Sequence, residues 1–208
     1  MNIGILGTGH IGSGLGKLWA EKGYQVCFGS RTPEKAEALA KTVGHGARSG
    51  TYGHAAEFAD VLLLAFPWQA CEAVLQSCGS LDGKILIDCI NPLGMDYRSL
   101  TVGYDTSVAE EIAKQAPEAK VVKAFNSISD KVIRLGADFN GQKASAFYCG
   151  DDSEAKATVH ELIAAIGFEP VDSGALKIAR YLEPMAVLFI NVAMNGYGSN
   201  IAFKLLQR

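Results

Sequence analysis

The clearest chemical signal in the sequence is a glycine pattern close to its beginning. Gly7, Gly9 and Gly12 form GxGxxG directly after the apolar run 2–7 and at the opening of an amphipathic helical pattern. In such a strand–loop–helix unit, the first glycine permits a tight turn, the second lets the backbone approach a pyrophosphate, and the third lets the helix pack on the strand. Free N–H groups at the helix N-terminus favour phosphate further. The sequence therefore predicts a dinucleotide-binding loop formed by Gly7, Thr8, Gly9, His10, Ile11 and Gly12.

Two alternatives accompany this loop. The glycines could form a turn that binds no ligand, although their position between strand and helix argues against it. His10 could contact a phosphate or the nicotinamide ribose, or it could simply be a variable loop residue.

The stretch "GSRTPEKA" after the next apolar run decides which dinucleotide is expected. NAD-binding domains carry an Asp or Glu here, about 20 residues after the glycines, for the ribose hydroxyls. This chain has Ser30 and Arg31 instead, with Lys35 in the following helix. A hydroxyl and a guanidinium bind a 2′-phosphate that a carboxylate would repel. These residues predict NADP(H), with a solvated surface arginine as the alternative.

Further candidates follow the other apolar runs, because ligands in open parallel sheets bind beyond the carboxyl ends of the strands. "AFPW" places Phe66, Pro67 and Trp68 there, and "CINP" places Asn91. "AFNSISD" places Asn126, Ser127 and Ile128 near a nicotinamide ring, with capping of the next segment as the alternative for the two polar residues.

The elements that must position these residues alternate between strand-like and helix-like patterns. Nearly continuous apolar runs are typical of strands buried on both faces of a parallel sheet. The helical pattern 33–42 begins with Thr32 as a predicted N-cap and Pro33 at its first position. The predicted strands are 2–7, 25–30, 61–66, 84–89, 120–125, 145–150 and 168–173, and the predicted helices are 11–22, 33–42, 69–77, 107–115 and 154–166. This alternation predicts a Rossmann-type, doubly wound α/β fold with a mainly parallel sheet.

The pattern changes after residue 174. Residues 1–174 form the predicted NADP-binding domain, and residues 175–208 form an apolar helical segment too short to be a domain of its own. Pro184 is expected to begin or kink a helix, which gives two pieces, 175–183 and 184–195, before a glycine-rich break and a last short turn. The segment should pack back on the sheet and cover a site.

Composition excludes several classes of function. The 208-residue chain has a formal net charge of −3, so no global field would attract nucleic acid or an anionic membrane. No signal peptide or membrane span is visible, and a cytoplasmic location is expected. The five cysteines have no CxxC spacing and no ligand spacing with the histidines, so buried reduced thiols are predicted and no metal site is expected.

Acid–base candidates are sparse. No Ser-His-Asp arrangement, paired-carboxylate motif or Tyr-x-x-x-Lys motif is present, and no catalytic residue can be named. Hydride transfer between a nicotinamide and a flavin-like ring needs little more than alignment of donor and acceptor.

The chain resembles the F420-dependent NADP reductases and, more loosely, the cytosolic NADPH-binding domain of six-transmembrane metalloreductases. "GTGHIG", "GSRTPEKA", "AFPW", "KVVKAFN", "GDDSEAK" and "NVAMNGYGSNIAFKLL" carry the resemblance in the family's order over nearly the whole chain. It implies hydride exchange between NADP and a planar acceptor, a homodimer, and a C-terminal segment that closes the acceptor pocket with Met194, Asn195 and Gly196.

The chain departs from the F420 enzymes at one place. Where they have a histidine, then a threonine and a proline after a strand, this chain has Asn126, Ser127 and Ser129. The small-molecule acceptor therefore stays open between F420, a flavin and another compound. A reductase of another small substrate and a non-catalytic NADPH sensor or partner subunit remain alternatives. Hydroxyacid dehydrogenase and pyrroline carboxylate reductase relatives have a much larger helical domain than this tail could form.

Overall fold

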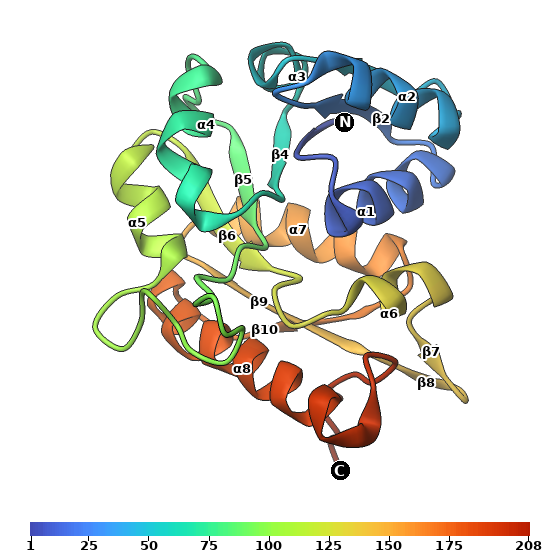
Figure 1. Ribbon diagram of the computed structural model, residues 1–208, viewed down its shortest axis with the longest axis vertical. Coiled ribbons are helices and arrows are strands. Elements are labelled where there is room, and N and C mark those ends of the chain that lie inside the picture. The colour runs from blue at the N-terminus through green and yellow to red at the C-terminus, as the bar shows by residue number, and fades with distance from the viewer.

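A single eight-stranded sheet organises the molecule, in a computed structural model that describes residues 1–208 (Figure 1). The strand order is β10-β9-β6-β5-β4-β1-β2-β3, and every neighbouring pair is parallel except β6 and β9. The strands are β1 (Asn2–Leu6), β2 (Gln25–Gly29), β3 (Arg48–Gly50), β4 (Val61–Leu64), β5 (Ile85–Asp88), β6 (Lys120–Ala124), β9 (Ser145–Gly150) and β10 (Glu169–Asp172). The run β3-β2-β1-β4-β5-β6 is the Rossmann order, which confirms the predicted fold class.

Helices cover both faces of this sheet. One face carries α1 (His10–Glu21), α2 (Pro33–Val43), α6 (Asp130–Leu135) and α7 (Ser153–Ala165). The other carries α3 (Tyr52–Phe58), α4 (Cys71–Ser77), α5 (Val108–Gln115) and α8 (Ala179–Val192). Shorter elements are η1 (Trp68–Ala70), η2 (Leu176–Ile178), η3 (Ala193–Tyr197) and the hairpin β7 (Asp138–Phe139) with β8 (Gln142–Lys143). None of the helices has the length and apolar character that a membrane crossing requires.

The core is divided between the two faces by the alternation of side chains along each strand. Ile3 and Ile5 of β1 join the cluster under α1 and α7, whereas Leu6 joins the cluster under α3, α4 and α5. The indole of Trp19 donates to the carbonyl of Leu162 over 3.0 Å, which ties α1 to α7. Strands that are apolar on both faces are therefore continuous apolar runs in the sequence.

Several predicted helix starts are confirmed. Helix α2 begins after Thr32 with Pro33 in its first turn, although the Thr32 side chain makes no capping hydrogen bond. Ser107 accepts from the N–H of Glu110 at the start of α5, and Asp152 accepts from the N–H of Ala155 at the start of α7. Side-chain caps supply partners for N–H groups that a helix leaves free.

Four elements were not predicted. They are β3, α3, α6 and the β7–β8 hairpin, all of seven residues or fewer. Such segments are too short to show a hydrophobic period in the sequence. Thr51 and Ser129 cap α3 and α6, so a polar cap was the one local signal available.

The predicted division of the C-terminal helix at Pro184 is wrong. A single helix, α8, runs through this proline, preceded by η2 and followed by η3. Pro184 has no N–H to donate to the carbonyl of Arg180, four residues earlier, and its ring crowds that carbonyl, but the contacts of α8 with the rest of the protein keep the helix continuous. The break at Gly196 and Gly198 is confirmed, with positive φ values of 103° and 68°. The predicted last turn is absent; the chain returns extended to the sheet, where Ser145 N–H donates to the carbonyl of Phe203 over 3.0 Å.

Candidate functional site

The glycine loop connects β1 to α1 at the carboxyl end of β1, the strand that lies between β4 and β2. Gly7 has a φ of +122°, and a Cβ there would lie 2.2 Å from the carbonyl oxygen of Ala65. A Cβ on Gly12 would lie 2.4 Å from the carbonyl oxygen of Gly7. These positions confirm the predicted turn at the first glycine and the close helix packing at the third.

Gly9 differs from its two neighbours in the motif. It is the N-cap of α1 with φ −74° and ψ 179°, and a Cβ there would meet nothing within 4 Å. No side chain caps this helix, so its first N–H groups face the open space above Gly9. The space and the unpaired donors fit a phosphate group, with Thr8 and Ile11 half-buried and His10 exposed beside them.

An outer cavity of about 690 Å³ lies beyond β2. Ser30 and Arg31 line it, together with Tyr52 at the start of α3 and Pro67 after β4, and no carboxylate does. The hydroxyl of Ser30 accepts from the N–H of Thr32 over 3.1 Å, which fixes the turn that presents Arg31. The structure thus brings Ser30, Arg31 and Pro67 together.

Three other predicted residues do not line this cavity. Lys35 is exposed in the first turn of α2. Phe66 is buried and joins the core cluster on the α3 side, and the half-buried Trp68 packs against the same cluster. Their positions leave the predicted roles of Lys35, Phe66 and Trp68 as predictions.

An inner cavity of about 210 Å³ lies at the carboxyl ends of β5 and β6. It brings together residues from the glycine loop, two strand ends and α8. Its lining includes the predicted residues Ile11, Asn91, Asn126, Ser127 and Ile128, with Cys89, Phe125, Ser129, Ala186, Phe189 and Ile190. Met194, Asn195 and Gly196 are exposed in η3 and are not part of this lining, so their contact with an acceptor stays a prediction.

The chain turns sharply where it enters the inner cavity. Phe125 is buried and has a φ of +63°, in the left-handed region that non-glycine residues rarely occupy. Its ring packs edge-on against Trp19 and Phe168, with centroid distances of 5.9 and 6.3 Å. This packing stabilises a strained residue directly before the predicted site residues, a placement common at functional sites.

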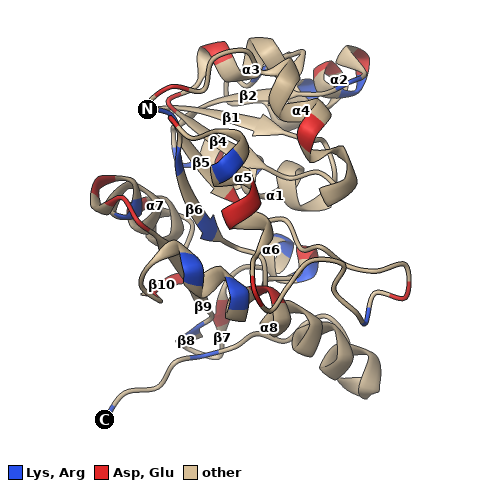
Figure 2. Ribbon diagram, turned by 90° about the vertical axis from the view of Figure 1, so that its left-hand side faces the viewer, with Lys and Arg blue, Asp and Glu red and all other residues tan.

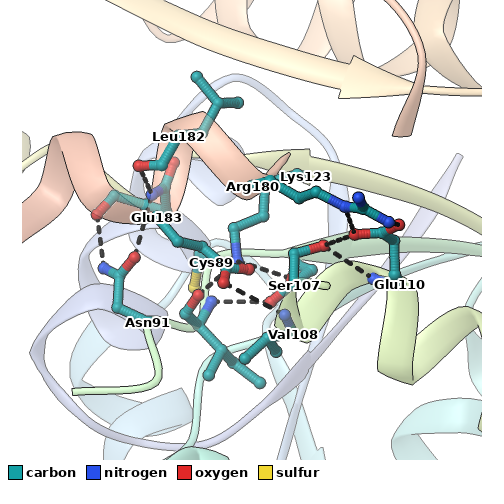
Figure 3. Close-up of polar contacts among 12 residues, drawn as sticks. Cys89, Asn91, Ser107, Val108, Glu110, Lys123, Arg180, Leu182 and Glu183 are labelled. Carbon is teal, nitrogen blue, oxygen red and sulfur yellow. Dashed lines mark hydrogen bonds and ion pairs between the residues drawn. The ribbon is translucent and has the colours of Figure 1, made fainter. Parts of the chain in front are cut away.

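Two asparagines join the ends of β5 and β6 to α8 (Figure 3). Asn91 Nδ2 donates to the carbonyl of Asn126 over 2.7 Å, and Asn126 Nδ2 donates to Asn91 Oδ1 and to the carbonyl of Leu182. Asn126 Oδ1 is buried and has no partner. An unpaired buried acceptor costs free energy unless a ligand or water supplies a donor. The alternative that Asn126 caps the next helix is not what the structure shows, because Ser129 caps α6.

A buried charged cluster that the sequence did not predict joins β5, β6 and α8 beside the inner cavity; Lys123 and Glu183 are labelled in Figure 3. Lys123 Nζ lies 2.8 Å from Asp88 Oδ2 and 2.8 Å from Glu183 Oε1, and it also donates to the carbonyl of Ile90. All three charged side chains are fully buried. Lys123 lies within "KVVKAF" and Asp88 within "LIDC". A charge inside an apolar strand is buried and needs a buried partner. The presence of these two charges in apolar runs is the sequence signal that could have predicted the cluster.

The charges of this cluster respond to burial and to one another. Burial alone would lower the pKa of Lys123, but the Asp88 and Glu183 carboxylates outweigh it and hold that pKa above its usual value. Burial raises the pKa of Glu183, and the nearby Lys123 offsets only part of this effect. Lys123 therefore stays protonated and supplies a fixed positive charge between two carboxyl groups.

The inner cavity contains little that could transfer a proton. Cys89 is the one ionisable side chain in its lining, and burial raises the pKa of this thiol to about 12. No three His, Cys, Asp or Glu side chains converge in a way that could hold a metal ion. A cavity of this kind can align apolar rings, but it offers no evident general acid or base.

Comparison with known proteins assigns the family. A sequence model described as "NADP oxidoreductase coenzyme F420-dependent" matches residues 2–92. The F420-dependent NADP reductase of Methanocaldococcus jannaschii is 32% identical, with all of both chains covered. The chain belongs to the F420-dependent NADP reductase family. The resemblance inferred from the motifs is confirmed, and the family places the chain among the NADP-dependent oxidoreductases.

Two further relatives define the extent of the likeness. Metalloreductase STEAP3 of Rattus norvegicus is 34% identical over 182 residues, which are 87% of this chain and 35% of that protein. The chain thus spans about a third of that metalloreductase. A crystal structure from Arthrobacter sp. FB24, assigned to the F420-dependent NADP reductases, superposes with a TM-score of 0.91 at 28% identity over all of both chains.

Proposed function

We propose that this family member binds NADPH across the carboxyl edge of the sheet and passes a hydride to a flavin-like or deazaflavin (F420) acceptor. The observation that carries the proposal is the inner cavity, which is mostly apolar and has one ionisable side chain, a thiol with a raised pKa. Reducing a ketone or an imine usually needs a proton donor, whereas transfer to a flavin-like ring needs alignment. NADPH would supply the hydride.

The chain's own residues would hold the cofactor at three places. The open space above Gly9 and the free N–H groups of α1 fit the pyrophosphate. Ser30 and Arg31, in a cavity without carboxylates, fit a 2′-phosphate, and the exposed Lys35 adds positive charge beside it. The buried, unpartnered Asn126 Oδ1 fits a donor such as a nicotinamide carboxamide. In this arrangement Asn91 orients Asn126, and Ile11 with Ile128 excludes water from the ring.

The C-terminal segment would close the acceptor side. Ala186, Phe189 and Ile190 of α8 line the inner cavity, so residues 175–208 form one of its walls. Met194, Asn195 and Gly196 would lie at the outer rim of the acceptor site. The five cysteines are free, which accords with a cytoplasmic location, where thiols are kept reduced.

The proposal includes a homodimer formed through the outer face of α8. Tyr181 and Leu188 lie two helical turns apart and are 71% and 55% exposed, and Met194 and Tyr197 continue the apolar surface into η3. Figure 2 shows the second half of α8 free of charged residues. Contiguous exposed apolar surface of this kind marks interaction sites.

The test is NADPH oxidation by the purified protein with F420, FMN, FAD or a ferric complex as trial acceptor. Turnover with F420 or a flavin supports the proposal. Turnover with the ferric complex alone would point to a metalloreductase activity. Tight NADPH binding without turnover on any acceptor would identify a sensor or a partner subunit instead of an enzyme.

A further inference from the structure

The first turns of α8 are attached to the rest of the protein by directional polar contacts. Arg180 makes a bidentate ion pair with Glu110 of α5, with its shortest contact at 2.7 Å. The carbonyl of Leu182 accepts from Asn126 over 2.6 Å. Glu183 accepts from Lys123 over 2.8 Å and from the N–H of Val108 over 3.2 Å. Three nearly consecutive residues of one helix are thus bound to α5, β6 and the loop after β6 (Figure 3).

Of these residues, Glu183 lies on the same stripe of α8 as the wall of the inner cavity. Residues three, four and seven positions apart share one face of a helix. Ala186 follows Glu183 by three positions, and Ile190 follows it by seven. Both line the inner cavity. Any rotation or sliding of α8 at Glu183 therefore moves the cavity wall.

Lys123 is the centre of this attachment. Its ammonium group joins Asp88 at the end of β5 to Glu183 of α8, and all three side chains are fully buried. Buried ion pairs contribute little net stability compared with apolar residues of the same volume, because desolvation offsets the attraction. Their hydrogen bonds require a defined geometry, so a buried cluster of this kind can specify where a helix lies.

We propose that Lys123 is a positioning residue, which fixes the rotation and height of α8 and thereby the shape of the inner cavity. This inference rests on the proposed function, in which that cavity receives the nicotinamide ring and the acceptor. Lys123 does not line the cavity, so it would act through Glu183 and α8.

The test compares the binding of NADPH with that of 2′,5′-ADP, which lacks the nicotinamide half. Lys123→Met keeps an unbranched side chain, one heavy atom shorter, and removes its charge. We expect this variant to lower the ratio of NADPH to 2′,5′-ADP affinity about tenfold, with 2′,5′-ADP affinity unchanged. Where an acceptor is turned over, kcat should fall by up to about 100-fold, because small misplacements of the reactants lower the rate by factors of this size. Loss of structure alone would weaken the binding of both nucleotides equally and leave the ratio unchanged.

Lys120→Met is the matched control. Lys120 lies on the same strand and pairs with Asp152 and Glu154, at 3.1 and 3.7 Å, but it is partly exposed and neither partner belongs to α8. This variant should keep the wild-type affinity ratio. A ratio that falls equally in both variants would overturn the assignment to Lys123.

A second variant covers the case in which Lys123→Met does not fold because Asp88 and Glu183 lose their cation. Glu183→Gln leaves Lys123 paired with Asp88 and should lower the ratio by a smaller factor. If both single variants fold, the double variant should resemble Lys123→Met, because the two residues act as one unit. If Lys123→Met folds and keeps the wild-type affinity ratio, the proposal is overturned. If Lys123→Met does not fold, a wild-type ratio in Glu183→Gln overturns it. A wild-type protein that turns over none of the trial acceptors would contradict the proposed function, and this outcome is measured separately from the affinity ratio.

Discussion

Replacing Gly9 with alanine should separate nucleotide binding from stability. The backbone angles at Gly9, φ −74° and ψ 179°, are open to any residue, and the added methyl group meets no atom within 4 Å. Alanine restricts the unfolded chain, which stabilises by about 0.4–1 kcal/mol. Alanine is also a poorer N-cap than glycine, at a cost of about 0.5–1 kcal/mol. The two effects offset, and the free energy of unfolding should change by less than about 0.5 kcal/mol.

Binding should respond differently, because the methyl group occupies the space that a pyrophosphate needs. The loss of one charge-assisted hydrogen bond from the helix N-terminus is worth about 1.5–3 kcal/mol. The Kd for NADPH should therefore rise about 10- to 150-fold. Urea unfolding without nucleotide and a fluorescence titration with NADPH measure the two quantities on the same preparation.

Gly12→Ala serves as the contrasting variant. Its methyl group would lie 2.4 Å from a backbone oxygen and 3.1 Å from Ile5 Cγ2, so the helix must move, at a typical cost of about 1–3 kcal/mol. If Gly9→Ala binds NADPH as tightly as the wild type, no phosphate approaches Gly9 and the assignment of the loop is refuted. Destabilisation of Gly9→Ala as large as that of Gly12→Ala would show that the space above Gly9 is not open.

Three further outcomes are expected. Arg31→Ala should weaken NADPH about tenfold, since the side chain is exposed and screened, and should leave NADH unchanged; equal losses would remove the 2′-phosphate assignment. Leu188→Glu should convert a dimer to a monomer in sedimentation, and an unchanged mass would exclude the outer face of α8 as the interface. Hydrogen bonds from Arg180 lower the pKa of Glu110, so this pair stabilises the fold near neutral pH and loses its contribution as the pH falls below the ordinary glutamate range. Glu110→Gln should therefore flatten the acid limb of the unfolding free energy against pH; a limb as steep as in the wild type would contradict this.

The sequence predicted much of the site through local signals. These signals can be recognised from residues close together in the chain. They are the glycine pattern, an arginine at position 31 in place of the usual carboxylate, and the polar residues that follow each strand. The sheet order then places Ile11, Asn91 and Asn126 in one cavity, as expected for residues at the carboxyl ends of adjacent strands. Lys35, Phe66 and Trp68 were chosen by the same reasoning and lie outside the outer cavity, because sequence position gives the element but not the direction of the side chain.

The sequence by itself determined the fold class, the family and the glycine turn between β1 and α1, because each depends on periodicity and spacing within short segments. The tertiary structure alone decided how α8 continues through Pro184 and what attaches it to the sheet. Lys123 and Glu183 lie 60 positions apart, and Asp88 lies 35 before Lys123. In the sequence they are isolated charges within apolar runs. Each charge is buried and therefore needs a charged or polar partner. These partners come from distant elements, so only the folded chain brings them within hydrogen-bonding distance.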